Sequence, residues 1–437
     1  MRDLSARLRA IVQKDAELAG TSPVSQQRAE LTYVPDVEAP SAPDDVAACL
    51  GGTPLDDGGA CIRVDRRYPA DRSHGRKSIE SYRPVRSAPL GLFDPRAAAV
   101  PEWWSRVVFF DIETTGLSGG AGTLAFLVGC GWFEANGDFL VRQFFLAGPS
   151  GERAMLGELA RLFNEASLVV TYNGRTFDVP FMETRWAFHR TSAPTGDMPH
   201  FDMLPPARRL WARRELLVPE SEGCSLSALE RRVLGFHRHA DVPGFEIPAR
   251  YFQFLRTGDP AAIEGVLEHN RHDLVSLAAV MSHALWLAGE GPVACREPAE
   301  QVALGRIYER AEREEGARAA FEMAVDTGDA EVQRHALGRL ALMHRRASRH
   351  VEAAQCWQGI LDLVPRGRRK LTPLERQAVE ALAIHHEHRA RDLERARTYA
   401  EALGAAVTGR QKDETNRRLD RLARKLGDRH VRPLYDE

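Results

Sequence analysis

The stretch that decides the fold is VVFFDIETTGL, residues 107–117. Its apolar run is β-branched and aromatic, which predicts a buried strand, and side chains two apart in a strand project from the same face. Asp111 and Glu113 are therefore predicted to lie side by side where this strand ends. Two ionised carboxylates in that position repel each other unless a cation neutralises them, and a hard divalent metal is the usual partner. The alternative is a strand end whose acids only meet water.

Composition places the chain among ordinary soluble globular proteins. Its 437 residues allow two or three domains, and 43% are apolar and 27% charged. The formal charge of −2 excludes a wholly basic surface, so binding of nucleic acid would need a local basic face. The longest near-apolar run, 123–133, is too short for a membrane span, and the N-terminus lacks a signal sequence. The six cysteines lack metal-site spacing and fit a reducing compartment, so a cytoplasmic protein is expected.

Residues 1–100 are expected to form a largely linker-like N-terminal region. A short amphipathic helix is predicted near residues 4–12, and the Pro/Asp/Gly-rich passage 34–60 is interpreted as linker. The basic segment 61–86 is either an arm for nucleic acid or a solvated segment, and the solvated alternative is favoured.

The body of the chain predicts a mixed α/β fold with antiparallel hairpins. Residues 123–133 and 139–146 are predicted strands on either side of an Asn136-Gly137 turn. A helical stripe follows at 156–163, and the short β-rich run 168–172 is predicted to return beside the first strand.

Two later acids extend the first pair. Asp178 ends the stretch YNGRTFD, residues 172–178, just before a predicted helix at 180–188, and by itself it would be interpreted as a helix cap. A longer helix is predicted over 261–287. Asp273 lies at the border of its apolar stripe, and His269 shares that border one turn earlier, so Asp273 can reach the sheet.

The order of these motifs resembles the proofreading-type 3′–5′ exonucleases of the ribonuclease H-like superfamily. DIETTG at 111–116 resembles their first motif, and Asn173 followed four residues later by Phe177-Asp178 resembles the second. The segments 201–208 and 224–230 resemble those between the second and third motifs. HNRHD at 269–273 resembles the smaller YprB-like branch. The resemblance covers about residues 105–285.

This resemblance implies an α/β ribonuclease H-like mixed sheet with flanking helices and a DEDD metal site. The ligands would be Asp111, Glu113, Asp178 and Asp273, three from strand ends and one from a helix. Two divalent ions about 4 Å apart suit phosphodiester hydrolysis, because together they activate water and stabilise the leaving oxygen. Oxygen ligands favour Mg²⁺ or Mn²⁺. Related enzymes place a Tyr at the spacing of His269, so His269 is either the general base or a residue that orients its neighbours.

Contacts with nucleic acid are expected beside this site. Asn173 and Phe177 would contribute through the second motif. Arg208 and Arg209 belong to a local basic excess that includes an aromatic residue, which is typical of phosphate contact. The alternative is a solvated amphipathic helix whose apolar side is buried.

Residues 296–437 are predicted to be helical throughout, with apolar residues at tetratricopeptide spacing that recurs 36 residues later. Such repeats usually bind protein, although a plain helical bundle that braces the nuclease is the alternative.

The sequence therefore predicts a metal-dependent nuclease domain at 101–290 followed by an all-α tetratricopeptide-like repeat domain at 296–437. The expected activity is that of a 3′–5′ exonuclease on single-stranded DNA or RNA, with a possible protein partner at the repeats and no membrane association. The competing hypothesis is a non-catalytic adaptor for nucleic acid or protein that retains the fold.

Overall fold

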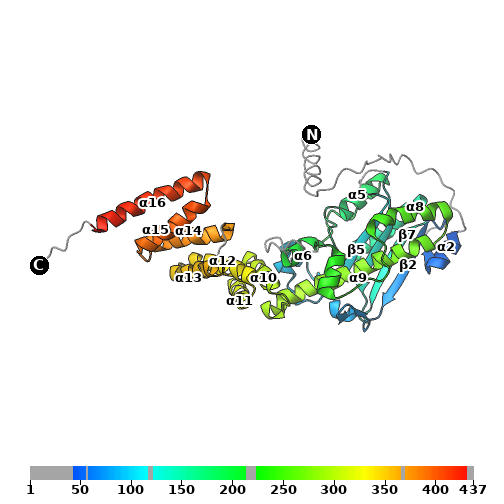
Figure 1. The fold of residues 1–437 in the computed structure, drawn as a ribbon. Helices are drawn as coiled ribbons and strands as arrows, with labels where there is room; N and C mark the ends of the chain where they lie inside the picture. The colour runs from blue at the N-terminus through cyan, green and yellow to red at the C-terminus, as the bar shows by residue number, and fades with distance from the viewer. Residues whose placement is uncertain (1–42, 56–57, 117–121, 213–222, 366–369, 431–437) are drawn as a thin grey trace. The chain divides into compact units, whose positions relative to one another are not determined.

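A seven-stranded sheet with the order β1-β2-β7-β6-β5-β8-β9 forms the centre of the molecule (Figure 1). The computed structural model describes residues 43–55, 58–116, 122–212, 223–365 and 370–430, so the helix predicted near residues 4–12 lies outside the described residues. The strands of the sheet are β1 (Thr53–Pro54), β2 (Cys61–Tyr68), β5 (Val107–Thr114), β6 (Ala125–Phe133), β7 (Phe139–Leu146), β8 (Leu168–Thr171) and β9 (His200–Asp202). A separate two-stranded ribbon pairs β3 (Ser73–His74) with β4 (Lys77–Ser78).

Strand β5 lies inside the sheet, as its apolar sequence predicts. It pairs antiparallel with β6 and parallel with β8, and β8 pairs parallel with β9. The predicted hairpin from β6 to β7 and the return of β8 beside β5 are therefore confirmed. The register between β5 and β6 shifts at Glu113/Thr114, an irregularity of the kind that often re-aims a side chain beside a functional site.

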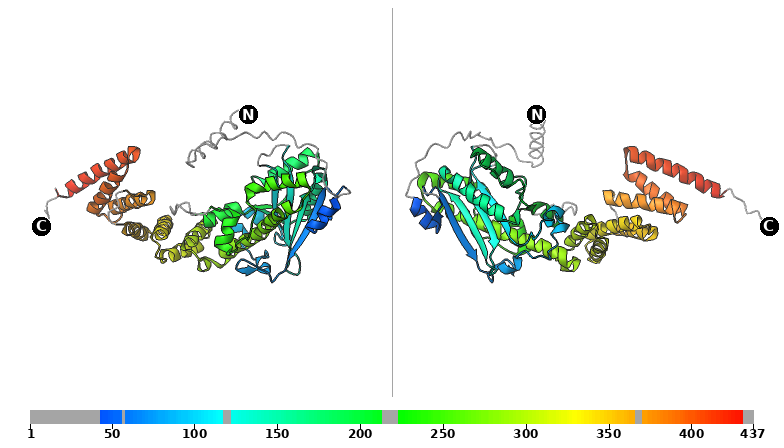
Figure 2. Two further views of the ribbon diagram at one scale, coloured as in Figure 1. Left: turned by 45° about the vertical axis from the view of Figure 1, so that its right-hand side comes forward. Right: turned by 180° about the vertical axis from the view of Figure 1, so that it is seen from behind.

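Alternate residues of β5 enter two different apolar clusters. Val108 and Phe110 pack in the cluster that also holds buried residues of α4 (Glu152–Glu165), α5 (Asp178–Phe188) and α8 (Ile247–Thr257). Val107 and Phe109 pack in the other, with the second half of α9 (Ala261–Glu290). Figure 1 shows α9 lying across the sheet, and Figure 2 shows the same layers turned and from behind.

The N-terminal region differs from the linker-like segment expected from its composition. Helix α2 (Pro43–Leu50) precedes β1, and β2 pairs with β7 along its whole length. Ile62 and Val64 are fully buried. The linker expected at residues 34–60 is wrong for the described residues, because α2 and β1 form there. In β2 the apolar residues are buried, whereas Arg66 and Arg67 are exposed to solvent, as the solvated alternative predicts. Short turns η1 (Ile79–Tyr82) and η2 (Leu90–Leu92) and helix α3 (Pro95–Ala98) then lead to β5.

Among the described residues, four short elements lie between β9 and α8. They are α6 (Leu204–Trp211), α7 (Leu226–Leu229), the π-helical turn η4 (Glu230–Leu234) and the 3-10 turn η5 (Gly244–Glu246). On α6 the predicted apolar side is buried, including Leu204, Ala207, Leu210 and Trp211.

The C-terminal region is all-helical, as expected. Its helices are α10 (Pro298–Arg310), α11 (Glu314–Val325), α12 (Ala330–Arg346), α13 (His350–Asp362), α14 (Pro373–His388), α15 (Leu393–Ala406) and α16 (Gly409–His430). Consecutive helices pack in the pairs α10–α11, α12–α13 and α14–α15 (yellow to orange in Figure 1). Close approach within the first pair requires Gly305, where a Cβ atom would lie 2.6 Å from the Phe321 ring. None of the described helices combines the length and the apolar character that a membrane span requires.

Candidate metal centre

Strand β5 carries the first two acids of the centre, Asp111 and Glu113, on either side of buried Ile112. Asp111 is paired in register with Gly129 of β6. This glycine leaves room for the buried side chain of Asn270 on α9, whose Nδ2 donates a hydrogen bond of 2.8 Å to Asp111 Oδ2. The absence of a side chain on one strand thus allows α9 to approach the acid on the next.

A glutamine holds the side-chain amide of Asn270 in place through a hydrogen bond to its oxygen. Gln143 of β7 is fully buried, and its Nε2 donates to Asn270 Oδ1 over 2.8 Å and to the Leu267 carbonyl over 2.8 Å. Since the Asn270 oxygen is occupied as an acceptor, its amide nitrogen faces Asp111. Asn270 belonged to the predicted motif, whereas nothing in the sequence around Gln143 distinguishes it from another buried strand residue.

Asp178 reaches the centre from a helix. The expectation that three of the acids come from strand ends is wrong for this residue, because Asp178 is the first residue of α5 and follows a loop after β8. Buried Asp202 at the end of β9 shapes that loop, since its carboxylate accepts hydrogen bonds from the backbone N–H groups of Asn173 (2.9 Å) and Arg175 (3.1 Å). Asn173 has φ of 70°, in the left-handed region that asparagine tolerates better than most residues.

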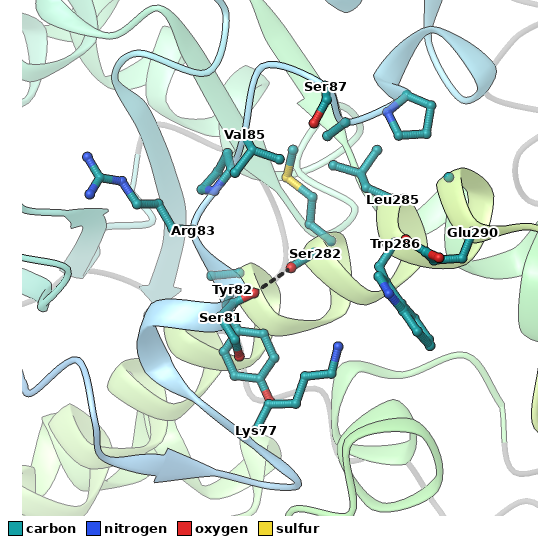
Figure 3. Close-up of a pocket in the computed structure, with 16 residues that line it drawn as sticks. Lys77, Ser81, Tyr82, Arg83, Val85, Ser87, Ser282, Leu285, Trp286 and Glu290 are labelled. Atoms are coloured by element: carbon teal, nitrogen blue, oxygen red, sulfur yellow. Dashed lines mark hydrogen bonds between the residues drawn. The ribbon is translucent and has the colours of Figure 1, made fainter. Parts of the chain in front are cut away.

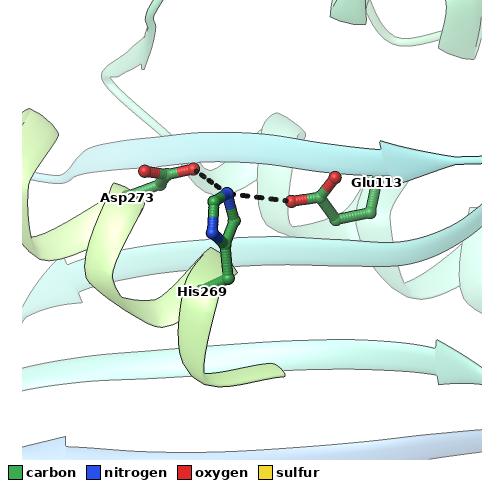
Figure 4. Close-up of side chains that lie close together, drawn as sticks. All are labelled: Glu113, His269 and Asp273. Atoms are coloured by element: carbon green, nitrogen blue, oxygen red, sulfur yellow. Dashed lines mark ion pairs between the residues drawn. The ribbon is translucent and has the colours of Figure 1, made fainter. Parts of the chain in front are cut away.

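Helix α9 brings His269 and Asp273 to the same place, as its predicted periodicity requires. His269 Nε2 lies 3.4 Å from Asp273 Oδ2 and 3.9 Å from Glu113 Oε1 (Figure 4). One ligand atom from each of these three residues lies within 4.8 Å of the others, which is compact enough for them to share a metal ion. The three side chains are 15–18% exposed, so the centre is reachable from solvent.

The electrostatics place all four predicted carboxylates in one cluster. Burial raises the pKa of Asp111 well above its usual range, and Asp273, Glu113 and Asp178 raise it further. Burial also raises the pKa of Glu113, with Asp273 and Asp178 adding to the effect. The pKa of Asp178 rises to about 7, chiefly through burial. The bond from Asn270 acts in the opposite direction on Asp111. The protein alone therefore does not supply enough positive charge to keep these acids ionised at low cost.

Asp241 is a further acid of the centre that the sequence did not indicate. Its Oδ1 lies 2.8 Å from His269 Nδ1, whereas the donor Arg238 Nη1 lies farther from the same nitrogen, at 3.3 Å. Because an ionised carboxylate can only accept, the shorter contact favours the tautomer with its hydrogen on Nδ1. Despite partial burial, His269 and Arg238 hold the pKa of Asp241 below its usual value, so it stays ionised. The second nitrogen, Nε2, then faces Glu113 and Asp273 with its lone pair when the ring is neutral.

Arg238 is the cation at this side of the centre. Its guanidinium contacts Asp273 Oδ1 directly, lies 3.1 Å from Asp241 Oδ2, and is only 6% exposed. Buried Glu230 of η4 accepts from Arg238 Nη2 over 2.6 Å and from Nε over 2.8 Å. No motif marks Arg238 or Asp241, which lie in an irregular segment, and Glu230, although it ends the motif-like segment 224–230, was not expected to take part in the centre.

The residues predicted to contact nucleic acid are placed less uniformly. Phe177 is half-buried and packs with the ring of Phe181. Arg208 is exposed on α6, whereas Arg209 donates to the Phe93 carbonyl over 3.2 Å and is partly buried. The side-chain oxygen of Asn173 accepts from the Thr176 hydroxyl over 2.9 Å. Asn173 and Arg209 thus already have partners within the protein.

A separate cavity of about 360 Å³ lies between residues 77–89 and the second half of α9 (Figure 3). Trp286 lines one side, with the Lys77 ammonium 4.4 Å from its ring centroid. The Ser282 hydroxyl donates to the Ser81 carbonyl over 3.3 Å across the floor. None of the residues that line this cavity belongs to the acidic centre, so the two sites are distinct.

Comparison with known proteins agrees with this geometry. A family model described as RNase_H superfamily matches residues 108–285, which include all four carboxylates and His269. The chain is also 31% identical over 301 residues to the Bacillus subtilis (strain 168) protein named "Uncharacterized protein YprB", an alignment that covers 68% of this chain and 70% of the relative. The chain belongs to the ribonuclease H superfamily. The predicted resemblance to the YprB-like branch is thereby confirmed, together with the α/β ribonuclease H-like sheet followed by a helical region.

The residues of this ribonuclease H-like centre fit a divalent cation. Carboxylates dominate the donor set, and burial, together with repulsion among them, raises the pKa values of three members. A cation that takes the place of the retained protons would offset both effects. A donor set made mainly of carboxylate oxygens suits Mg²⁺ or Mn²⁺.

Proposed function

We propose that this protein is a metal-dependent nuclease, and specifically a 3′–5′ exonuclease acting on single-stranded DNA or RNA. The proposal is supported by Glu113, His269 and Asp273, whose ligand atoms lie within 4.8 Å of one another, and by the electrostatic coupling of Asp111 to Glu113, Asp178 and Asp273. Membership of the superfamily supports nuclease chemistry in general, and the motif order supports the exonuclease polarity.

Asp111, Glu113, Asp178 and Asp273 would hold two Mg²⁺ or Mn²⁺ ions. When bound, such a pair activates water and stabilises the leaving oxygen of a phosphodiester. Asp111 would be one of these ligands, because its carboxylate is coupled to all three of the other acids. Asn270 keeps one oxygen of Asp111 oriented through its 2.8 Å bond.

His269 is assigned as the general base of this reaction. Asp241 holds the hydrogen on Nδ1, so Nε2 presents its lone pair toward the centre and can accept a proton from the attacking water. Asp241 also stabilises the imidazolium that results. This arrangement favours the base assignment over a purely orienting role for His269, which would not require the second nitrogen to be free.

The decisive experiment is the product ladder from end-labelled single-stranded DNA and RNA incubated with Mg²⁺, Mn²⁺ or a chelator. A ladder that shortens from the 3′ end, requires the metal and disappears in Asp111→Ala supports the proposal. Undiminished cleavage in chelator or by folded Asp111→Ala protein would contradict the metal mechanism.

A second candidate function is favoured by Arg238. Its guanidinium already contacts Asp273, one of the expected metal ligands, so the chain partly neutralises its own centre. In a non-catalytic adaptor that keeps the fold, an arginine could take the place of the metal ion beside Asp273 without loss of function. Binding of oligonucleotide without metal-dependent turnover, in the same assay, would support this alternative.

The remaining parts are assigned supporting roles. We infer that residues 296–437 form tetratricopeptide-like repeats that bind a protein partner or substrate, because their helices pack in successive pairs. Arg208, exposed on α6, is the arginine best placed among the predicted contacts to bind phosphate. All six cysteines are free, which supports the expectation of a reducing compartment such as the cytoplasm.

A further inference from the structure

The π-helical turn η4 has a defined task in this fold. It ends at Gly235, whose φ is 67°. Arg76, between β3 and β4, stabilises the turn with two hydrogen bonds. Its backbone N–H donates to the Leu234 carbonyl over 3.0 Å, and its guanidinium donates to the Val233 carbonyl over 2.8 Å. π-helical turns are uncommon and often occur at functional sites. Here the turn begins at Glu230, which is 2% exposed and directed at Arg238.

Glu230 is itself part of a buried polar chain. The Ser276 hydroxyl on α9 hydrogen-bonds to Glu230, and His74 Nε2 of β3 lies 2.8 Å from the same hydroxyl. Burial lowers the pKa of His74 to about 3, so this imidazole is neutral and adds no charge to the chain of contacts. Glu230 therefore has a fixed position before it meets the guanidinium.

Arg238 distributes its donors among three carboxylates. Nε and Nη2 form a fork on Glu230, Nη2 also contacts Asp273, and Nη1 lies 3.1 Å from Asp241. With Oδ1 of Asp273 held by the guanidinium, Oδ2 is the oxygen left facing His269. Since Asp241 also holds His269, one arginine sets both residues that α9 contributes to the centre.

We propose that Arg238 is a positioning residue that holds Asp273 and the Asp241–His269 pair in place opposite Glu113. Its own position is set by the hydrogen bonds to Glu230 on the π-helical turn. The proposal rests on the proposed metal-dependent function, because it concerns ligands of that site. Arg238 is not assigned to the phosphate, since its donors face the three carboxylates and His269 Nδ1, which lies 3.3 Å from Nη1, and its side chain is 6% exposed. Its contribution is geometric and requires the planar fork of a guanidinium.

Arg238→Lys separates geometry from charge. A lysine keeps the positive charge but is a point donor and cannot span Glu230 while reaching Asp241 and Asp273. Loss of a residue that orients a metal ligand typically weakens metal affinity by about 10- to 100-fold. We expect Arg238→Lys to weaken Mn²⁺ binding by at least about 10-fold, measured by electron paramagnetic resonance of free Mn²⁺ on the full-length protein. Glu230→Gln, which leaves every expected ligand and Arg238 intact, should weaken it in the same direction.

The matched control is Arg142→Lys. Arg142 makes a similar fork on Asp65, with bonds of 2.9 and 2.8 Å between β7 and β2, and contacts no member of the centre in the described residues. The control should lose some thermal stability and keep the Mn²⁺ affinity of the unaltered protein. Unchanged Mn²⁺ affinity in folded Arg238→Lys, or in Glu230→Gln if the lysine variant does not fold, overturns the positioning role alone. Failure of the unaltered protein to bind Mn²⁺ overturns the proposed function and this inference with it.

Discussion

Replacing Asp178 by Asn should stabilise the metal-free protein at neutral and mildly alkaline pH. Burial raises the pKa of Asp178 from 3.8 to about 7 in the folded protein. When folding raises the pKa of an acid, its contribution to the free energy of unfolding is fully present only below the pKa of the unfolded chain. That contribution is lost as the pH rises through the pKa of the folded protein. For Asp178 the loss falls between about pH 4 and pH 7. Asparagine does not ionise, so the variant should not show this loss.

The magnitude follows from the size of the shift. A difference of about three units at ~1.4 kcal/mol per unit corresponds to at most about 4 kcal/mol at pH 8. Backbone hydrogen bonds from residues 178 and 112 favour the ionised carboxylate, and the pKa of about 7 already includes their effect. We therefore expect Asp178→Asn to be more stable than the unaltered protein by up to about 4 kcal/mol at pH 8 in chelator, with the advantage disappearing near pH 4.

Urea unfolding at pH 4, 5, 6, 7 and 8 in chelator measures this difference. Asp202→Asn is the control, because Asp202 is equally buried, at 5%, but accepts hydrogen bonds from three backbone N–H groups and should lose stability at every pH. Saturating Mn²⁺ should reverse the order of Asp178→Asn and the unaltered protein, because ligand binding stabilises the form that binds it better. An asparagine variant that is less stable at pH 8, with no dependence on pH, would refute the electrostatic account of the centre.

Three other results are expected. Gly129→Ala should destabilise the protein by about 1–3 kcal/mol and lower metal affinity, since the new Cβ would lie 2.8 Å from Leu274 Cδ1 and would displace Asn270. The control is Gly157→Ala, where a Cβ would have nothing within 4 Å. Urea unfolding and Mn²⁺ titration measure both variants. In turnover at saturating Mn²⁺, His269→Ala should lose on the order of 10²- to 10⁴-fold and His269→Tyr should recover part of it, whereas near-full activity in His269→Asn would rule out the base. A fragment 39–295 should be less soluble than 39–349, as judged by size-exclusion chromatography, because Trp211 donates to buried Glu300 of α10 over 2.9 Å and one apolar core continues into α10, α11 and α12. Equal solubility would show that the repeats are independent.

The helical region thus participates in the core more than its sequence suggests. Leu304 and Phe321 are fully buried in the same cluster as Phe109 of β5. The division at residues 290–296 remains a prediction about domains, and the solubility of the two fragments tests it. The N-terminal boundary predicted near residue 100 also divides one packed unit, since β2, which precedes it, pairs with β7 in the sheet.

The sequence by itself determined the elements whose signal is local. The run at 107–114 predicts β5 because β-branched and aromatic residues favour a buried strand, and the periodicity of 261–287 predicts α9 with His269 and Asp273 on one edge, because helical spacing is a property of neighbours in the chain. Motif order then predicted that Asp178 joins them.

Only the tertiary structure decided how those acids are supported. Gln143, Glu230, Arg238 and Asp241 come from a strand, a π-helical turn and a loop, and each is an ordinary polar residue in its own segment. Their function arises from contacts between segments far apart in the chain, such as the 2.8 Å bond between Asp241 and His269, 28 residues away. The strand β2 was missed for a related reason, because charged residues interrupt its apolar pattern and its pairing with β7 is what buries Ile62 and Val64. Local patterns specify which side chains face the core. The hydrogen-bond or ion-pair partner of each buried charge is specified only by the tertiary contacts of the folded chain.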